Sequence, residues 1–478
     1  MTPSSSLKPA WERWIPVVGV VLAVLVAVLK RGRQHPDELF QFLEPAHGLA
    51  FGYWLVTWEW VAGLRNWAVP GVLGGVLALC GKVGLVHPWA MASVVWGCCA
   101  AVQAWGTWAL FRLVEERDGR EAALLASAVH VTWGGWLLYA ARPLADSLSV
   151  VPLLGSLLWA WRARARDGLR EGFWCGALLG LAFVVRYPSA VFGGPIAVSL
   201  LRARRWRSVA GGAVGVGVVL LGLGLLDWLT WGALWHSAWK YFEFNVLHKG
   251  ADAFGTKPWW WYFTSLAGMV PLLLAWHFGR GLARRDLLVG AFAFYLGVMT
   301  MLTHKELRFM APLLPLFVAI AAGPAWRTLS QRVLSRRALG GLVGVYALSS
   351  LAAATVQMPG SVSREQIDAT VFVGQQPDLT GFIVAGQQEW NAIGRFHLHR
   401  DVPLLVRPNK DLQDLDGPLT DPKFSHVLVI KDALRAQKLE ADGFCVLRRW
   451  GPAVLWRRCP SPSFQRASQE RLSSPSGP

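Results

Sequence analysis

Long apolar runs constrain the fold of this chain more than any other feature. WIPVVGVVLAVLVAVL covers residues 14–29, and SVAGGAVGVGVVLLGLGLL covers residues 208–226. A helix needs about 20 apolar residues to cross the hydrocarbon core of a bilayer. Only 16% of the residues are charged, compared with about a quarter in soluble domains. The pattern therefore predicts an all-α polytopic membrane protein.

The hydropathy pattern predicts about eleven transmembrane helices. They are expected at 14–29, 89–112, 122–140, 147–161, 173–185, 190–201, 208–228, 259–279, 286–303, 309–326 and 338–357. The stretch 67–86 contains Pro70 and Lys82 and is expected to be re-entrant or interfacial. The first run precedes KRGRQHP, which is unlike a cleavage site, so we expect a retained anchor.

The net charge of +17 is carried largely by arginines in short loops between the apolar runs. With the N-terminus inside, the arginine-dense loops around 112–120, 162–170, 202–207, 280–285 and 327–337 all fall on one side, as the positive-inside rule requires. Membrane topology therefore explains the basic charge, and we predict no nucleic-acid partner.

The opposite side receives segments rich in acids, histidine and tryptophan, and also the C-terminal part of the chain. Residues 1–357 form the predicted membrane domain, with 31–66 as its first outward loop; 358–460, with short β-like runs, is predicted to be a small extracytoplasmic α/β domain, and 461–478 a disordered tail. Cys445 and Cys459 are able to pair if this side is oxidising.

The segment HPDELFQFLEPAH at 35–47 is the first candidate for chemistry. Pro36 suits the first turn of a helix, and Asp37 and Glu38 then lie at its positive end. Helical spacing places Asp37, Gln41 and Glu44 on one inward face. The apolar side chains of the same segment are expected to face lipid: Leu39, Phe40, Phe42 and Leu43.

The segment THKELRF at 303–309 is the second candidate. His304, Lys305 and Arg308 surround the single acid Glu306, a balance that suits an anionic phosphate or pyrophosphate. Elsewhere on the same side, Arg142 and Asp146 form either a structural ion pair or part of a ligand site.

A carboxylate, a cation cluster and a membrane-embedded body suit glycosyl transfer from a lipid-linked sugar phosphate. The lipid requires a groove between helices, the phosphate leaving group requires cations, and the attacking hydroxyl requires one general base.

The motifs HPDE, TWEW and HKELRF, together with FNVLHKGADAFGTKPWWWYF, resemble the dolichyl- or polyprenyl-phosphate-mannose-dependent α-mannosyltransferases of glycosyltransferase family 22, which have the GT-C fold. The resemblance covers residues 12–330. It implies inverting transfer of mannose to a glycan or glycolipid, without a metal or other cofactor. The residue roles that it implies are a general base at Asp37 or Glu38, donor-phosphate contacts from Arg142, His304, Lys305 and Arg308, and acceptor contacts from Glu44, His47 and Glu59.

Three alternatives remain open at this point: transfer of another lipid-linked sugar such as arabinose, a lipid-linked saccharide flippase or transporter, and a metal enzyme using His35, Glu38, Glu44 and His47. The residue usage, rich in Ala, Gly, Arg and Trp, favours a bacterial inner membrane with the active face periplasmic, or the endoplasmic reticulum if the source is eukaryotic.

Overall fold

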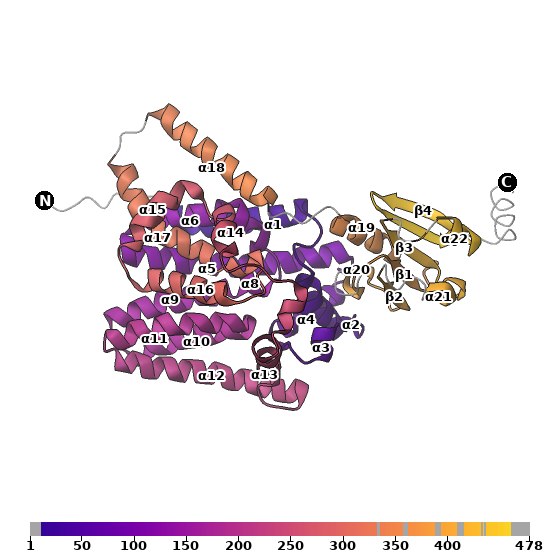
Figure 1. The fold of residues 1–478 in the computed structure, drawn as a ribbon, viewed down its shortest axis with the longest axis horizontal. Coiled ribbons are helices and arrows are strands. Elements are labelled where there is room, and N and C mark those ends of the chain that lie inside the picture. The colour runs from indigo at the N-terminus through magenta and orange to yellow at the C-terminus, as the bar shows by residue number, and fades with distance from the viewer. Residues whose placement is uncertain are drawn as a thin grey trace.

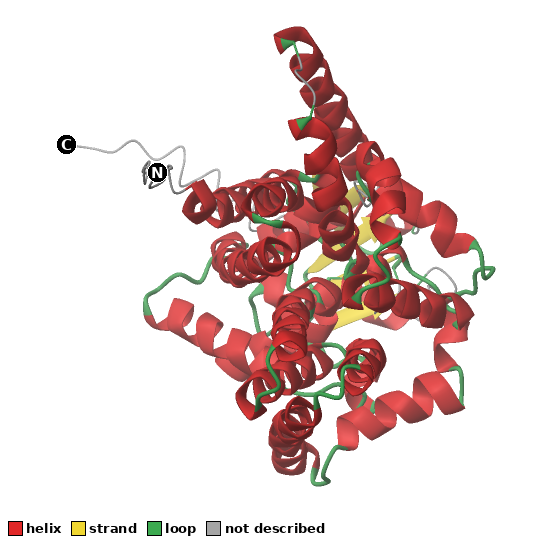
Figure 2. Cartoon of the chain, turned by 90° about the vertical axis from the view of Figure 1, so that its left-hand side faces the viewer, coloured by secondary structure: helices red, strands yellow, loops and turns green. Residues whose placement is uncertain are grey.

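The computed structural model describes residues 11–331, 335–356, 362–387, 393–408, 415–431, 434 and 436–459, which form a helical bundle with a small sheet at one end (Figure 1). Seen end on in Figure 2, the helices lie in front and the strands lie behind them. The helices of the bundle are α1 (Trp11–Leu29), α2 (Glu44–Phe51), α3 (Trp58–Val61), α4 (Ala68–Lys82), α5 (Pro88–Asp118), α6 (Arg120–Thr132), α7 (Gly134–Ala140), α8 (Ala145–Leu148), α9 (Val150–Ala165), α10 (Leu169–Val185), α11 (Gly193–Arg202), α12 (Trp206–Trp231), α13 (His236–Phe242), α14 (Trp261–Met269), α15 (Ala275–Leu282), α16 (Leu287–Met301), α17 (Leu313–Ser330) and α18 (Arg336–Val356). Short π or 3-10 turns are η1 (Glu38–Leu43), η2 (Tyr187–Phe192), η3 (Glu243–Leu247), η4 (Gly250–Phe254), η5 (Leu272–Leu274) and η6 (Leu307–Met310).

The polytopic membrane character is supported, but the predicted number of about eleven spans is not confirmed. Among the described residues, four helices are long and apolar enough to cross a bilayer: Pro88–Asp118, Trp206–Trp231, Leu307–Ser330 and Arg336–Thr355. A fifth span results if α6 and α7, which meet at 67°, count as one. The other expected spans are shorter or interrupted: 190–201 is the ten-residue α11, and 259–279 is divided into α14, η5 and part of α15.

Helices α10 and α12 approach closely because glycines line their contact. A Cβ atom on Gly172 would overlap the carbonyl oxygen of Ser208, and one on Gly176 would overlap that of Gly212. Small residues at such positions let backbones pack directly against one another, as is common in membrane helices. This packing fixes the end of α10, where the chain enters η2, beside the segment that follows α12.

The arginine-rich loops meet at one end of the bundle, which we call the basic end. Arg117 Nε lies 2.8 Å from Asp286 Oδ2, and Arg162 Nη2 lies 2.6 Å from Glu116 Oε1. These pairs join loops that are far apart in sequence. The sheet lies at the opposite end of the molecule (Figure 1).

The C-terminal part is a five-stranded sheet in the order β2-β1-β3-β5-β4. Its elements are α19 (Val362–Gly374), β1 (Phe382–Ala385), α20 (Arg395–Leu398), β2 (Leu404–Arg407), α21 (Asp416–Thr420), β3 (His426–Ile430), α22 (Ala436–Ala441), β4 (Phe444–Trp450) and β5 (Ala453–Arg458). Strand β1 pairs in parallel with β2 and β3, whereas β5 is antiparallel to β3 and β4. Phe382 and Val384 pack on the α19 side, whereas Ile383 and Ala385 pack on the side of α21 and α22, because successive strand residues point to opposite faces.

The sheet lies within the segment 358–460 that was predicted to be α/β, and the tail 461–478 lies outside the described residues. Cys445 on β4 and Cys459, which follows β5, form a disulfide with a Cα–Cα distance of 5.2 Å. The two cysteines singled out in the sequence are therefore joined, and the bond closes the edge hairpin of the sheet.

The contact between bundle and sheet region is built around helix α2. The carboxylate of Glu44 accepts the backbone N–H of Leu55 at 2.7 Å and that of Phe396 at 2.6 Å. Nε2 of His47 lies 3.0 Å from Nδ1 of His399. Glu44 and His47 are both fully buried, so these polar contacts tie α2 to α20 away from water.

We expect Glu44→Ala to loosen this contact, because two buried N–H groups would lose their acceptor, at about 1–3 kcal/mol each. The melting temperature of the purified protein should fall, and protease should cut between bundle and sheet region faster. The matched control is Glu440→Ala, at an exposed position of α22. Equal melting temperature and equal cleavage rate in Glu44→Ala and wild type would contradict this role.

Candidate functional site

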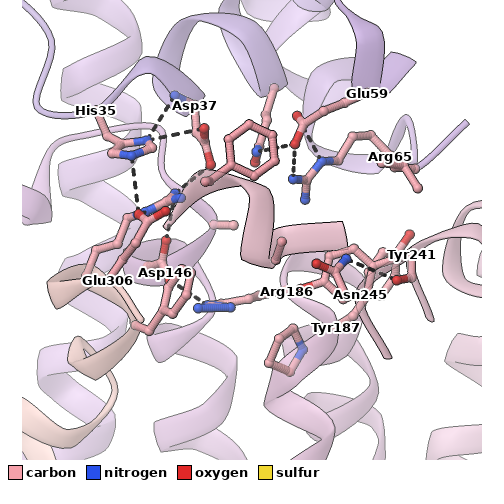
Figure 3. Close-up of a pocket in the computed structure, with 18 of the residues that line it drawn as sticks. His35, Asp37, Glu59, Arg65, Asp146, Arg186, Tyr187, Tyr241, Asn245 and Glu306 are labelled. Carbon is pink, nitrogen blue, oxygen red and sulfur yellow. Dashed lines mark hydrogen bonds and ion pairs between the residues drawn. The ribbon is translucent and has the colours of Figure 1, made fainter. Parts of the chain in front are cut away.

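A cavity of about 850 Å³ opens at the end of the bundle that faces away from the basic end. Its polar lining comes from six segments far apart in sequence (Figure 3): 35–42, 57–66, 145–146, 184–188, 241–257 and 304–309. The first of these begins the predicted site segment. Since all six reach the same space, the cavity collects side chains that local sequence patterns cannot relate.

The first site segment contains a π-helical turn rather than a regular α-helix. In η1 the chain makes hydrogen bonds five residues apart, such as the N–H of Glu44 to the oxygen of Leu39. The wider turn rotates the residues that follow. Asp37 and Gln41 line the cavity, whereas Glu44 points to the sheet region. The apolar side chains of the segment do not face lipid as expected but are buried in the protein: Leu39, Phe40, Phe42 and Leu43.

Asp37 lies in a network of charged groups at the cavity wall. Its Oδ2 accepts a hydrogen bond from Arg308 Nη1 at 2.6 Å, and its Oδ1 lies 3.2 Å from His35 Nδ1. Glu306 completes the network, at 3.3 Å from His35 and 2.5 Å from Arg308. Burial would raise the pKa of Asp37, but Arg308 and His35 hold that pKa well below its usual range. The structure therefore holds Asp37 as a carboxylate.

The imidazole of His35 is held in its charged form by the same network. Burial and the neighbouring Arg308 would lower the pKa of His35, but the carboxylates of Asp37 and Glu306 raise it to about 9. His35 therefore acts as a cation bridging two acids.

Asp146 joins two guanidinium groups at the floor of the cavity. Its Oδ1 lies 2.6 Å from Nε of Arg186, and its Oδ2 accepts from Nη1 of Arg308 at 3.3 Å. Only 1% of Asp146 is exposed. The sequence analysis considered an ion pair between Arg142 and Asp146 as one alternative. In the structure Asp146 instead pairs with Arg186 and Arg308. Arg142 pairs with Glu38.

A second polar group lies across the cavity from Asp37 (Figure 3). Arg65 donates two hydrogen bonds to the carboxylate of Glu59, at 2.6 and 3.2 Å, and Gln41 donates to the same acid at 3.4 Å. The guanidinium lies 5.7 Å from the ring centre of Tyr241. Beside the aromatic rings of Trp58 and Tyr241, this wall offers both a carboxylate and stacking surfaces.

Of the site residues predicted from sequence, the structure brings these to the cavity: Asp37, Glu59, His304, Lys305 and Arg308. His304 contacts Glu306 at 3.0 Å and the carbonyl oxygen of Gly255 at 2.7 Å. Lys305 is 4% exposed and donates to the carbonyl oxygens of Leu302 and Lys257. Both cations are thus engaged with protein groups at the cavity wall.

Glu38 and Arg142 lie behind the cavity wall. Glu38 is 2% exposed, accepts the N–H of His35 at 2.9 Å and lies 3.5 Å from Arg142. Burial raises the pKa of Glu38 despite the nearby Arg142. Arg142 donates to the carbonyl oxygens of Gly32 and Lys30, at 2.6 and 2.9 Å, so it ties down the chain after α1. Neither residue lines the cavity.

Glu44 and His47, predicted to contact the acceptor, also lie outside the cavity lining, in the contact with the sheet region. Burial raises the pKa of Glu44 to about 7, although backbone N–H groups lower it. Burial likewise lowers the pKa of His47 to about 4. Both shifts have the same cause, since the sheet region covers these side chains.

Several residues that line the cavity were given no role in the sequence analysis, among them Arg65, Tyr241 and Asn245. Arg65 follows a motif already singled out, TWEW, and the pairing of its charge with Glu59 six residues earlier was the available clue. Asn245 lies in the segment FNVLHKGADAFGTKPWWWYF, which carried part of the family resemblance without a role for single residues, and Tyr241 lies just before that segment.

The alternative metal site is not assembled. Within the described part of the chain, no three His, Cys, Asp or Glu side chains are grouped so that they could hold a metal ion. His35 lines the cavity, whereas Glu44 and His47 contact the sheet region.

Comparison with known proteins relates the chain to a single family. The profile of the Alg9-like mannosyltransferase family matches residues 14–362. Mannosyltransferase APTG1 of Arabidopsis thaliana is 28% identical over 61% of this chain and 55% of that protein. GPI mannosyltransferase 3 of Yarrowia lipolytica is 26% identical over 77% and 72%, and GPI alpha-1,2-mannosyltransferase 3 of Homo sapiens 25% identical over 62% and 54%. The chain thus spans about half of the length of two of these three relatives.

Solved structures relate the fold to membrane enzymes. ArnT from Cupriavidus metallidurans, solved with undecaprenyl phosphate bound, superposes with a TM-score of 0.67 at 14% identity, over 94% of this chain and 98% of ArnT. The archaeal oligosaccharyltransferase AglB from Archaeoglobus fulgidus, in complex with an inhibitory peptide and a dolichol-phosphate, has a TM-score of 0.53 at 11% identity, over 90% and 70%. These likenesses show a shared fold, in agreement with the expected GT-C type.

The charged state of His35 makes a testable contribution to stability. Because its pKa is raised from 6.5 to about 9, the stabilisation is fully present below pH 6.5 and is lost as the pH rises through about 9. The difference in melting temperature between wild type and His35→Gln should therefore shrink from pH 6.5 to above pH 9. His248→Gln, at an exposed position, is the control. A difference that is constant over this range would show that His35 is not held as a cation.

Proposed function

The chain belongs to the Alg9-like mannosyltransferase family, and we propose that it transfers mannose from a polyprenyl-phosphate carrier to a hydroxyl of a glycan or glycolipid, with inversion at the anomeric carbon. The observation that carries this proposal is the pairing of Asp37 with Arg308 at 2.6 Å in one cavity. A carboxylate and a guanidinium at the same place suit proton removal from the acceptor and stabilisation of the departing phosphate.

In the proposed reaction, the acceptor hydroxyl oxygen attacks the anomeric carbon and its proton passes to Asp37. The bond between that carbon and the phosphate oxygen breaks, and the phosphate leaves with the electron pair. Because phosphate is a stable anion, it needs cations and no general acid, so one carboxylate suffices. Arg308, with His304 and Lys305 behind it, supplies positive charge at the leaving group.

The contact between Asp37 and Arg308 gives the donor a way to activate the base. In the structure, Arg308 donates to Asp37, Asp146 and Glu306. A phosphate that competes for Arg308 weakens its hold on Asp37, and loss of a neighbouring cation raises the pKa of a carboxylate. Asp37 then becomes a stronger base only when the donor is present.

The acceptor is proposed to bind on the wall formed by Glu59 and Arg65, opposite Asp37. Hydroxyl groups of a sugar suit a carboxylate and amide or guanidinium donors, and the rings of Trp58 and Tyr241 offer stacking surfaces. Glu44, His47, Glu38 and Arg142 have no part in this proposal, because they do not line the cavity.

We further propose that the protein lies in a bacterial inner membrane with the cavity on the extracytoplasmic side. The arginine-rich loops at the opposite end support this orientation through the positive-inside rule. The disulfide between Cys445 and Cys459, in the region at the cavity end, supports an oxidising compartment. The similar fold of ArnT, a protein solved with undecaprenyl phosphate, supports a polyprenyl carrier.

Loss of the proposed base tests the mechanism directly. In nanodiscs supplied with polyprenyl-phosphate mannose and candidate acceptors, we expect Asp37→Asn to lower kcat by roughly 10²- to 10⁴-fold. Glu38→Gln should lower the melting temperature but reduce kcat far less than Asp37→Asn does, because Glu38 is buried behind the cavity wall. Asp416→Asn, on the surface of the sheet region, is the matched control. A kcat of Asp37→Asn within a few-fold of wild type would exclude Asp37 as the base, and transfer only from a different lipid-linked sugar would exclude mannose.

Cysteine labelling tests the orientation. The test starts from a variant in which the four free cysteines are replaced by alanine: Cys80, Cys98, Cys99 and Cys175. Cysteines then placed by Arg202→Cys, at the basic end, and Asp416→Cys, in the sheet region, should react with a membrane-impermeant maleimide from opposite sides of a sealed vesicle. In right-side-out vesicles only the cysteine at 416 should react from outside. Reaction of both from the same side would refute the proposed topology.

A further inference from the structure

Arg186 is a buried cavity side chain whose hydrogen-bonding capacity is only partly used. It follows α10, lines the cavity and is 8% exposed. Its Nε lies 2.6 Å from Asp146 Oδ1, and its guanidinium carbon lies 4.7 Å from the ring centre of Phe309. Nevertheless its Nε and Nη2 have no hydrogen-bond partner of suitable geometry. An arginine carries five N–H donors, and leaving them unbonded away from water is costly, so the site is suited to an incoming acceptor.

The other cations of the cavity wall differ from Arg186 in this respect. Arg65 uses Nε and Nη2 on Glu59. Lys305 donates to two backbone carbonyl oxygens, and His304 contacts Glu306. These donors are already directed at protein groups, whereas Nη2 of Arg186 is buried without a hydrogen-bond partner.

Asp146 holds Arg186 next to Arg308. One oxygen of this carboxylate faces each guanidinium, at 2.6 and 3.3 Å. Without a buried anion between them the two arginines would repel each other. Arg308 also contacts Asp37 and Glu306, whereas Asp146 is the one carboxylate that contacts Arg186 among the ion pairs of the described residues. Figure 3 shows Arg186 beside Asp146 in the cavity lining.

We propose that Arg186 and Arg308 form a two-arginine clamp for a phosphate monoester or diester, with Asp146 as the residue that positions both guanidiniums. Two planar guanidiniums held by the same carboxylate suit a tetrahedral phosphate, which offers several oxygens at once. The inference deepens the proposed function and rests on it, since the phosphate is that of the lipid carrier. The proposal assigns a donor-phosphate contact to Arg186, at the end of α10, which lies outside the two candidate segments 35–47 and 303–309.

Binding without chemistry tests the clamp. Purified full-length protein in nanodiscs is titrated with undecaprenyl phosphate, with undecaprenol and with inorganic phosphate. We expect Arg186→Gln to weaken binding of undecaprenyl phosphate and of inorganic phosphate by roughly 10- to 100-fold, the range expected for lost charge-assisted hydrogen bonds. The affinity of Arg186→Lys should be intermediate, because an ammonium group keeps the positive charge but lacks the two parallel N–H donors of a guanidinium. Arg202→Gln, an exposed arginine at the basic end, removes the same charge and should bind like wild type.

The outcomes separate this inference from the proposed function. If wild type binds undecaprenyl phosphate and Arg186→Gln binds it equally well, the clamp is wrong and the proposed function stands. If wild type binds undecaprenol as tightly as undecaprenyl phosphate, phosphate recognition is absent and both fail. If Arg186→Gln does not fold, Arg186→Lys decides: wild-type affinity in that variant overturns the two-arginine geometry.

Discussion

The ion pair between Asp37 and Arg308 joins two segments that are 271 residues apart in sequence. Both groups lie at a wall of low exposure, where a charge without a partner costs several kcal/mol. Each segment is therefore held in place by the charge on the other. Three further polar groups at this wall depend on the pair, because His35, Glu306 and Asp146 each contact one of its members.

The acids and cations of the cavity are nearly equal in number, so the position of each charge determines the local electrostatics more than the net charge does. Acids and cations alternate so that each carboxylate contacts at least one cation, and Asp146 serves two. In the proposed reaction a donor phosphate would take the place of a protein carboxylate in this preorganised network, which lowers the cost of reorganisation. The same network holds the pKa of Asp37 low, and in the proposed reaction the donor phosphate would relax this hold by competing for Arg308.

The sheet region helps to hold the first site segment in place. Helix α2 follows directly on the π-helical turn that carries the cavity residue Gln41, and Glu44 at its start accepts the backbone N–H of Phe396. The contact with the sheet region thus buttresses the segment that places Asp37 and Gln41 in the cavity. Acids only a few residues apart serve different purposes because the wider π turn rotates Glu44 away from the cavity.

The sequence by itself determined the membrane character, the separation of arginine-rich from chemically varied loops, the C-terminal α/β region, its cysteine pair and the two motifs that carry Asp37 and Arg308. These features depend on composition and on spacing within short segments. Only the tertiary structure decided that Asp37 and not Glu38 faces the cavity, that Glu44 and His47 hold the sheet region, and that Arg186 joins Arg308. Such choices depend on how helices pack and rotate against one another. That packing brings together residues one hundred or more positions apart, and no local periodicity records it.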